Sequence, residues 1–127
     1  MLLATVGMVI PSTPAAPHHS ISSAYDASKV ITLEGVVAQF HFVYPHPFVT
    51  IDVQQGSARW TLEMDNRSEL ARAGMTSETL KPGDRIVVTG SPARGGGQSL
   101  YIRKLERPAD GFQYEQVGTS PRIRAGR

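Results

Sequence analysis

Four histidines are the residues of this sequence with the clearest capacity for chemistry: His18, His19, His41 and His46. Neutral imidazole is the commonest metal ligand in proteins, and a ligand set made only of nitrogens suits Cu(II), Zn(II) or Ni(II). The chain has no cysteine, which excludes thiolate ligands, disulfides and cysteine nucleophiles together. We therefore predict that these histidines bind a transition metal, copper or zinc.

The first histidine pair follows an apolar leader. Residues 1–10 are uncharged and apolar, and a Pro/Ala-rich stretch leads on to Ala16. This length fits the core of a signal peptide and is too short to span a bilayer. We predict that residues 1–16 are a signal peptide or its remnant, that residues 17–29 form an extended arm, and that the protein is periplasmic or secreted. A short buried strand joined to a linker is the alternative.

Export would place a free amine beside the histidine pair. Cleavage after Ala16 gives a mature end Pro17-His18-His19, in which the amine, two backbone amides and the third-position imidazole can enclose a square-planar Cu(II). Cleavage after Ala15 puts Pro17 second, where it has no amide proton, and that geometry fails. The two cleavage sites therefore make opposite predictions.

His46 falls between two predicted strands. Residues 31–43 are rich in β-branched and aromatic side chains, and residues 48–53 alternate between apolar and polar, so both stretches favour strands. Pro45 and Pro47 cannot donate to a sheet ladder, which predicts a turn or sheet edge around the histidine. We expect His46 to be rigidly held at a strand end.

The arm offers a way to complete a metal site at this turn. If it folds back, His18 or His19 can meet His46, and Tyr25 and Asp26 are then candidates to orient the ligands by hydrogen bonds. The alternative is that the paired histidines are solvated, that His41 is a surface position, and that His46 only stabilises its turn.

The remaining patterns predict a bend, a short helix and three later strands. A phase change beside Gly35 predicts a bulge or strong bend in the first strand, and Asn66 with Glu69 resembles a helix-capping box. The order strand, strand, strand, short helix, strand, strand predicts an all-β, five-stranded OB-like barrel over residues 30–107, with a five-stranded roll or small sandwich as the alternative. The later strands are expected at residues 59–64, 85–90 and 99–106, and residues 108–127 are expected to be a disordered polar tail.

A metal-free binding module is the alternative function. In OB barrels, the face of strands two and three commonly holds ligands. Exposed aromatic rings there could stack on a ligand and arginines could add charge, and the partner would be a cell-envelope protein or a glycan. Nucleic acid is disfavoured because the net charge is only +2. The residues in question are Phe42, Tyr44, Phe48 and Trp60, with Arg59, Arg94 and Arg103; the rings could equally fill the core.

No catalytic constellation is visible. Asp52, Glu63 and Asp65 are predicted near one end of adjacent strands, but outward positions of a solvated sheet look the same. No serine has a nucleophile-elbow context, and the glycine run at 95–97 lacks the lysine and helix of a phosphate-binding loop. We predict that the protein is not an enzyme and that the mature chain has no membrane span.

Several motifs in order carry a family resemblance. They are Pro17-His18-His19-Ser20, Tyr25-Asp26, the strand TLEGVV, Tyr44-Pro45-His46 and the later LKPGD. Over roughly residues 18–106 the chain resembles small exported bacterial proteins of unknown function, with a His-His-Ser start and an Asn-Pro-His turn. Here Tyr44 stands in place of the Asn, and Pro17 precedes the histidines. The resemblance implies export and a small β fold, and it implies no activity.

Overall fold

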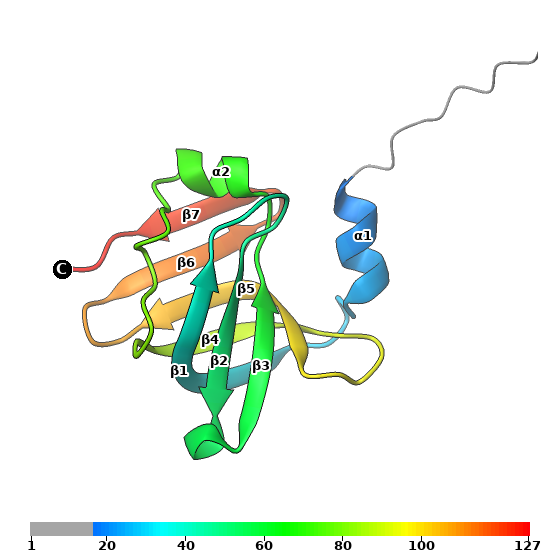
Figure 1. The fold of residues 1–127 in the computed structure, drawn as a ribbon. Helices are drawn as coiled ribbons and strands as arrows, with labels where there is room; N and C mark the ends of the chain where they lie inside the picture. The colour runs from blue at the N-terminus through cyan, green and yellow to red at the C-terminus, as the bar shows by residue number, and fades with distance from the viewer. Residues whose placement is uncertain (1–16) are drawn as a thin grey trace, which may run out of the picture.

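The computed structural model of the chain describes residues 17–127 (Figure 1). The predicted signal peptide, residues 1–16, lies outside the described residues. The elements follow in the order α1 (Pro17–Ala24), β1 (Ile31–His41), β2 (Phe48–Val53), a 3-10 turn (Gln54–Gly56), β3 (Ala58–Glu63), α2 (Arg67–Arg72), β4 (Arg85–Pro92), β5 (Ser99–Arg107), β6 (Phe112–Val117) and β7 (Ser120–Arg124).

The first five strands close into a barrel. Neighbouring strands follow the order β3-β2-β1-β4-β5-β6-β7, and β3 also pairs in parallel with β5 through Leu62 and Leu100. That extra pairing joins the two sides of the β1–β5 sheet, so these strands have no open edge. The predicted all-β, five-stranded OB-like barrel is confirmed over the alternative of a five-stranded roll or small sandwich.

Strand β1 is long and serves two neighbours. Its first half pairs with β4 and its second half with β2, and the two pairings overlap at Gly35. A Cβ atom at this position would meet the backbone oxygen of Asp52 at 2.6 Å, so only glycine fits the turn from one pairing to the next. The bend predicted at Gly35 therefore has a structural cause, while the register shift itself falls slightly later, between Val37 and Gln39.

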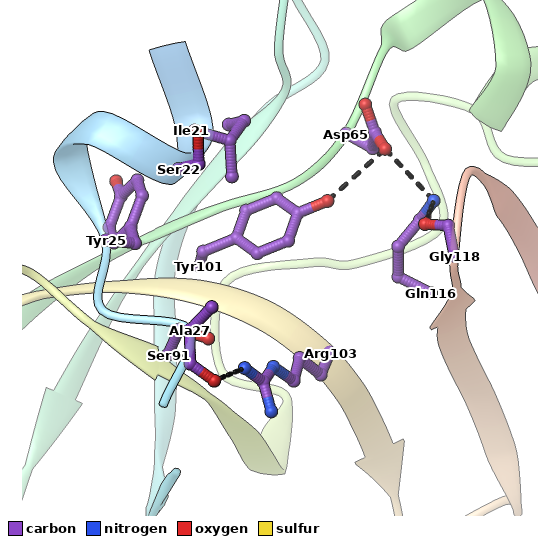
Figure 2. A pocket seen from close by; sticks show the side chains of 10 residues that line it. All are labelled: Ile21, Ser22, Tyr25, Ala27, Asp65, Ser91, Tyr101, Arg103, Gln116 and Gly118. Atoms are coloured by element: carbon purple, nitrogen blue, oxygen red, sulfur yellow. Dashed lines mark hydrogen bonds between the residues drawn. The ribbon is translucent and has the colours of Figure 1, made fainter. Parts of the chain in front are cut away.

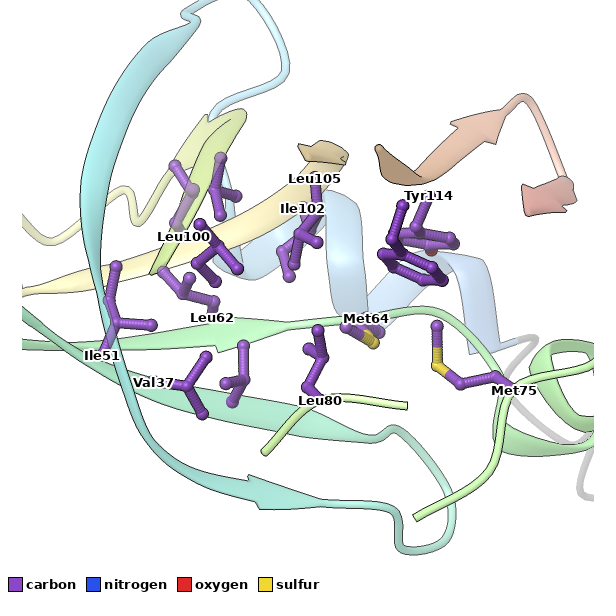
Figure 3. Close-up of a cluster of buried hydrophobic side chains, with 14 of the residues drawn as sticks. Val37, Ile51, Leu62, Met64, Met75, Leu80, Leu100, Ile102, Leu105 and Tyr114 are labelled. Atoms are coloured by element: carbon purple, nitrogen blue, oxygen red, sulfur yellow. The ribbon is translucent and has the colours of Figure 1, made fainter. Parts of the chain in front are cut away.

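Alternate residues of the barrel strands fill one apolar core (Figure 3). Leu62, Leu100 and Ile102 have no solvent exposure, and they face residues of β1 and β2 across the interior. Trp60, which alternation also directs inward, is partly buried and packs against this core. The period-two pattern of each strand thus predicts correctly which face is buried.

The expected disordered tail is wrong. Residues 112–124 form the hairpin β6–β7, and β6 extends the sheet by pairing with β5. Phe112 and Tyr114 stand two residues apart, so both point to the same face and join the core; Tyr114 is 0 % exposed. The polar average of the segment concealed this apolar pair.

The expected extended arm is also wrong over its first half. Residues 17–24 form helix α1, which starts at Pro17, a favoured first helical residue because it needs no N–H partner. Beyond the helix, Tyr25 pairs with Ala93 and the amide of Asp26 donates to the carbonyl of Pro92 at 2.9 Å. The segment is thereby anchored to the end of β4. Across residues 17–127, no helix has the length and apolar character that crossing a membrane requires.

Candidate functional site

The segment Glu63-Met64-Asp65, which we call the junction, links β3 to α2 and holds two separate sites. The backbone amide of Met64 donates to the carbonyl of Pro47 at 2.9 Å, so the junction is tied to the turn between β1 and β2. At its end, the side chain of Asn66 accepts a hydrogen bond from the amide of Ser68 at 2.8 Å, which confirms the predicted cap of α2.

His46 lies in this turn, after a cis peptide bond between Tyr44 and Pro45. Its Nδ1 is 3.1 Å from the carbonyl oxygen of Met64. A carbonyl oxygen can only accept, so the contact requires a proton on Nδ1, and the neutral ring then keeps the lone pair of Nε2. The imidazole is therefore held in one orientation by the junction, as predicted for a rigid strand-end histidine.

A pocket of about 350 Å3 opens beside this histidine. We call it the turn pocket. Phe48 and Glu63 are directly paired across β2 and β3, and both line it. Its wall is formed by Val43, Tyr44, Pro45, His46, Phe48, Thr61 and Glu63.

Tyr25 reaches the turn pocket through Glu63. The tyrosine hydroxyl donates to Oε2 of Glu63 at 2.6 Å. Burial raises the pKa of the Tyr25 hydroxyl well above its ordinary value, and the hydrogen bond and charge of Glu63 raise this pKa further. Asp26 instead accepts from the amide and hydroxyl of Ser28, at 3.0 and 2.6 Å, and so shapes its own turn.

The other histidines are placed differently. The ring of His41 stacks on Phe48 with centroids 4.3 Å apart, and it lines a separate groove with Gln39 and Glu78. His18 and His19 fall in the first turn of α1, and their side chains lie outside the described part. Where side chains are described, no three histidine, aspartate or glutamate residues gather in a group that could hold a metal ion.

The aromatic residues predicted to bind a ligand gather around an arginine that the sequence did not single out. The guanidinium carbon of Arg67 lies 4.5 Å from the ring centroids of both Phe42 and Tyr44. Its Nε donates to the carbonyl of Phe42 at 3.0 Å. Tyr44 remains 68 % exposed. We call Phe42, Tyr44 and Phe48 with Arg67 the aromatic patch.

Arg59 does not belong to this patch. It is paired with Asp52 across β2 and β3, with its Nε 2.8 Å from Oδ1 of that aspartate. This pair lies at the opposite end of the two strands from Glu63. The expectation that Asp52, Glu63 and Asp65 share one strand end is therefore wrong for Asp52.

The second site is a cavity of about 300 Å3 behind the junction (Figure 2). We call it the polar cavity. The side chain of Asp65, 7 % exposed, accepts from Tyr101 at 3.3 Å and Gln116 at 3.0 Å through Oδ2, and from the amide of Asn66 at 2.7 Å through Oδ1. The lining residues come from α1 and the segment after it, the junction, β4, β5 and the β6–β7 hairpin: Ile21, Ser22, Tyr25, Ala27, Asp65, Ser91, Tyr101, Arg103, Gln116 and Gly118.

The sequence marks Tyr25, Asp65 and Arg103 as separate candidates, and no motif in it indicates that they share one cavity. Tyr101 and Gln116 were not singled out at all. The cavity depends on α1, where an extended arm is expected from the sequence, and on the β6–β7 hairpin, where a disordered tail is expected. The one available signal was the alternation of Phe112 and Tyr114, which predicts a strand and hence a neighbour for β5.

A protein-family model covers most of the chain. Residues 6–100 match the model of DUF6152, a family of unknown function. The chain belongs to this family. Membership in a family of unknown function agrees with the resemblance carried by the sequence motifs. The DUF6152 match ends within β5, so the β6–β7 hairpin lies beyond it.

Comparison with solved structures finds chains of TiaS, the tRNAIle2 agmatidine synthetase. The ZRD-deleted TiaS mutant in complex with agmatine is similar at 18 % identity and a TM-score of 0.49, covering 75 % of this chain and 24 % of the other. The apo enzyme gives 18 % and 0.48, covering 82 % and 25 %. This DUF6152 chain thus spans about a quarter of those chains. No curated protein matches it.

Proposed function

We propose that this DUF6152 domain is an exported binding module that holds a transition-metal ion, copper or zinc, with His46 as the anchoring ligand. The observation that carries the proposal is the 3.1 Å contact between Nδ1 of His46 and the carbonyl oxygen of Met64. Metal-ligating histidines commonly direct their second ring nitrogen to such a carbonyl, which fixes the tautomer and the ring orientation. Nε2 then keeps its lone pair for a metal ion.

Glu63 supplies a second donor to the same pocket. Its Oε2 is engaged by Tyr25, a carboxylate oriented by a hydrogen bond, and both carboxylate oxygen and imidazole nitrogen are common Zn(II) ligands. Two protein donors do not complete a site. The remaining ligands would come from His18, from His19 or from the amine of the mature N-terminus. His41 leaves the ligand set because it lines another groove.

The proposal of export is supported by the apolar stretch of residues 1–10 and by the histidine pair that follows it. A periplasmic or secreted protein can present its N-terminal amine to copper or zinc, and its partners would be proteins of the cell envelope. We propose a non-catalytic role, because the two carboxylates at the junction are engaged by Tyr25 on one side and by Tyr101 and Gln116 on the other.

The test is a titration with Cu(II) and Zn(II) of protein exported natively, so that its N-terminus is authentic. His46→Ala is compared with His41→Ala, a matched control that removes a histidine from the neighbouring groove. One-to-one binding weakened at least tenfold by His46→Ala alone supports the proposal. Binding indifferent to His46 would assign the metal to the N-terminal amine, and weak binding in all variants would remove the metal site altogether; either result contradicts the proposal.

The aromatic patch favours a second candidate, a metal-free module for a glycan or an envelope protein. Tyr44 is exposed while Arg67 is held between two rings, so the patch presents aromatic faces in a fixed arrangement. It lies at the β2 end that leads into the turn pocket, on the face where OB barrels commonly bind ligands. Tyr44→Ala should weaken binding to cell-wall glycan fragments at least tenfold, whereas Arg59→Ala, remote from the patch, should not.

A further inference from the structure

The polar cavity contains charged groups that the fold itself does not neutralise. Asp65 accepts three hydrogen bonds, all from neutral donors, and it forms no ion pair with any residue that the structure describes. A carboxylate offers about four acceptor positions, so about one position remains on Asp65. A buried carboxylate with neutral partners is most stable when a cation comes close.

A positive group lines the same cavity. One nitrogen of Arg103 donates to the backbone carbonyl of Ala27 at 2.6 Å, and within residues 21–127 this arginine has no carboxylate partner. A guanidinium carries five N–H donors in a planar fork, so the single bond leaves most of its capacity for a ligand. Asp65 and Arg103 lie on different sides of the Tyr101 ring in Figure 2.

Two further features of the cavity lining are a pair of tyrosine rings and a buried serine. The rings of Tyr25 and Tyr101 pack against each other, tilted by 40° with centroids 5.9 Å apart, and both line the cavity, so they form an aromatic wall. Ser91 is only 2 % exposed and also lines the cavity, so a ligand there can contact its hydroxyl.

We propose that the polar cavity binds a small zwitterion, a molecule of amino-acid size with an ammonium group and a carboxylate. The ammonium group is held by the remaining acceptor position of Asp65. The carboxylate is held by the guanidinium of Arg103 and the hydroxyl of Ser91. A volume of about 300 Å3 is at the lower end of pockets that hold small organic molecules, which restricts the ligand to this size.

The test uses isothermal titration calorimetry with alanine, β-alanine and γ-aminobutyrate, which span three separations of amine and carboxylate. Butylamine and butyrate serve as half-ligands. The experiment contains a chelator, so it does not depend on the metal site proposed at His46. At least one zwitterion should bind at least tenfold more tightly than either half-ligand.

Two variants assign the ends, each with a matched control. Arg103→Gln should lower zwitterion affinity at least tenfold and leave butylamine binding unchanged, whereas Lys104→Gln removes an exposed positive charge from the same strand and should have no effect. Asp65→Asn should abolish the preference for an ammonium group, with the exposed Asp52→Asn as control. If Asp65→Asn fails to fold, the Arg103 pair alone decides the outcome.

Three results would overturn the proposal: no binding of any zwitterion, equal affinity for a zwitterion and a half-ligand, or affinity that Arg103→Gln does not change. The third result would place the ligand outside the cavity.

Discussion

The turn pocket and the polar cavity lie on either side of one three-residue junction, yet their chemistry is opposite. The turn pocket is open and mostly apolar, and its fixed polar groups are the imidazole of His46 on a backbone carbonyl and the carboxylate of Glu63 on the Tyr25 hydroxyl. The polar cavity has a buried carboxylate with three donors and an arginine without a carboxylate partner among the described residues. Glu63 is the last residue of β3, whereas Asp65 lies beyond the strand in the segment that leads to α2, so the two carboxylates serve different sites.

The difference also concerns stability. Asp65, Tyr101 and Gln116 in the polar cavity are buried or partly buried and are hydrogen-bonded through Asp65, so removing Asp65 leaves the others without their partner. Groups of the turn pocket and the aromatic patch are largely exposed, so water can replace what is lost. We therefore expect perturbations of the cavity to unfold the protein and perturbations of the turn to leave it folded.

Alkaline pH should produce the largest effect. Burial first, and then nearby carboxylates, raise the pKa values of Tyr25 and Tyr101; burial, then Tyr101 and Asp65, raises that of Tyr114. The unfolded chain releases these protons near pH 10, so stability is full below about pH 10 and falls above it, by about 1.4 kcal/mol per pH unit for each tyrosine. Urea unfolding from about pH 8 to about pH 11 measures this slope. Tyr25→Phe should make the slope of unfolding free energy against pH smaller by the contribution of one tyrosine. A flat profile would contradict the burial of these hydroxyls.

Tyr114→Ala tests whether the hairpin beyond the family match is part of the folded core. Tyr114 is fully buried, and its removal leaves a large void beneath β6, so we expect a loss of about 3–5 kcal/mol in the free energy of unfolding. Chemical denaturation measures it. Val117→Ala on the same strand is exposed and serves as the control; equal, small losses in both variants would mean that the hairpin does not pack on the barrel.

Asp65→Ala should cost about 2–3 kcal/mol, because Tyr101 and Gln116 lose their shared acceptor in a buried setting. Thermal and urea unfolding report the change. Asp52→Ala, which removes an exposed carboxylate paired with Arg59, should leave unfolding unchanged within error. Equal effects of the two substitutions would remove the contrast between cavity and surface.

Arg67→Ala should have the smallest effect, about 1 kcal/mol, since the two ring contacts and one hydrogen bond that it loses are partly exposed. The more informative measurement is fluorescence or NMR of Tyr44, which should become mobile when the guanidinium no longer lies against its ring. A loss above about 3 kcal/mol would mean that the patch contributes to the fold as a buried core does.

The sequence predicts the barrel well because alternation and turn residues are local signals. Residues 48–53 and 59–64 alternate cleanly, and Gly35 marks the bend at the point where two pairings overlap. The same local signals predict that His46 lies at the end of a strand in a fixed orientation. These features depend on neighbouring residues only.

The polar cavity could not be predicted in the same way. Its carboxylate precedes α2, its arginine is on β5, and its remaining walls come from α1 and the hairpin. Helix α1 is short and begins in a Pro/His context with little helix propensity, so composition favoured an extended arm. The position of α1 is set by the packing of Tyr25 against β4 and β5, and no local sequence pattern indicates this packing.

The span of each site along the chain has a consequence during synthesis. Every wall of the turn pocket lies between residues 43 and 63, so a nascent chain that has emerged through β3 already carries all of its residues. The polar cavity joins Ile21 to Gln116 and Gly118, so it cannot close until β6 has left the ribosome. A small molecule that requires this cavity would therefore recognise only chains whose synthesis has passed β6, and it could not assist the barrel while the barrel is forming.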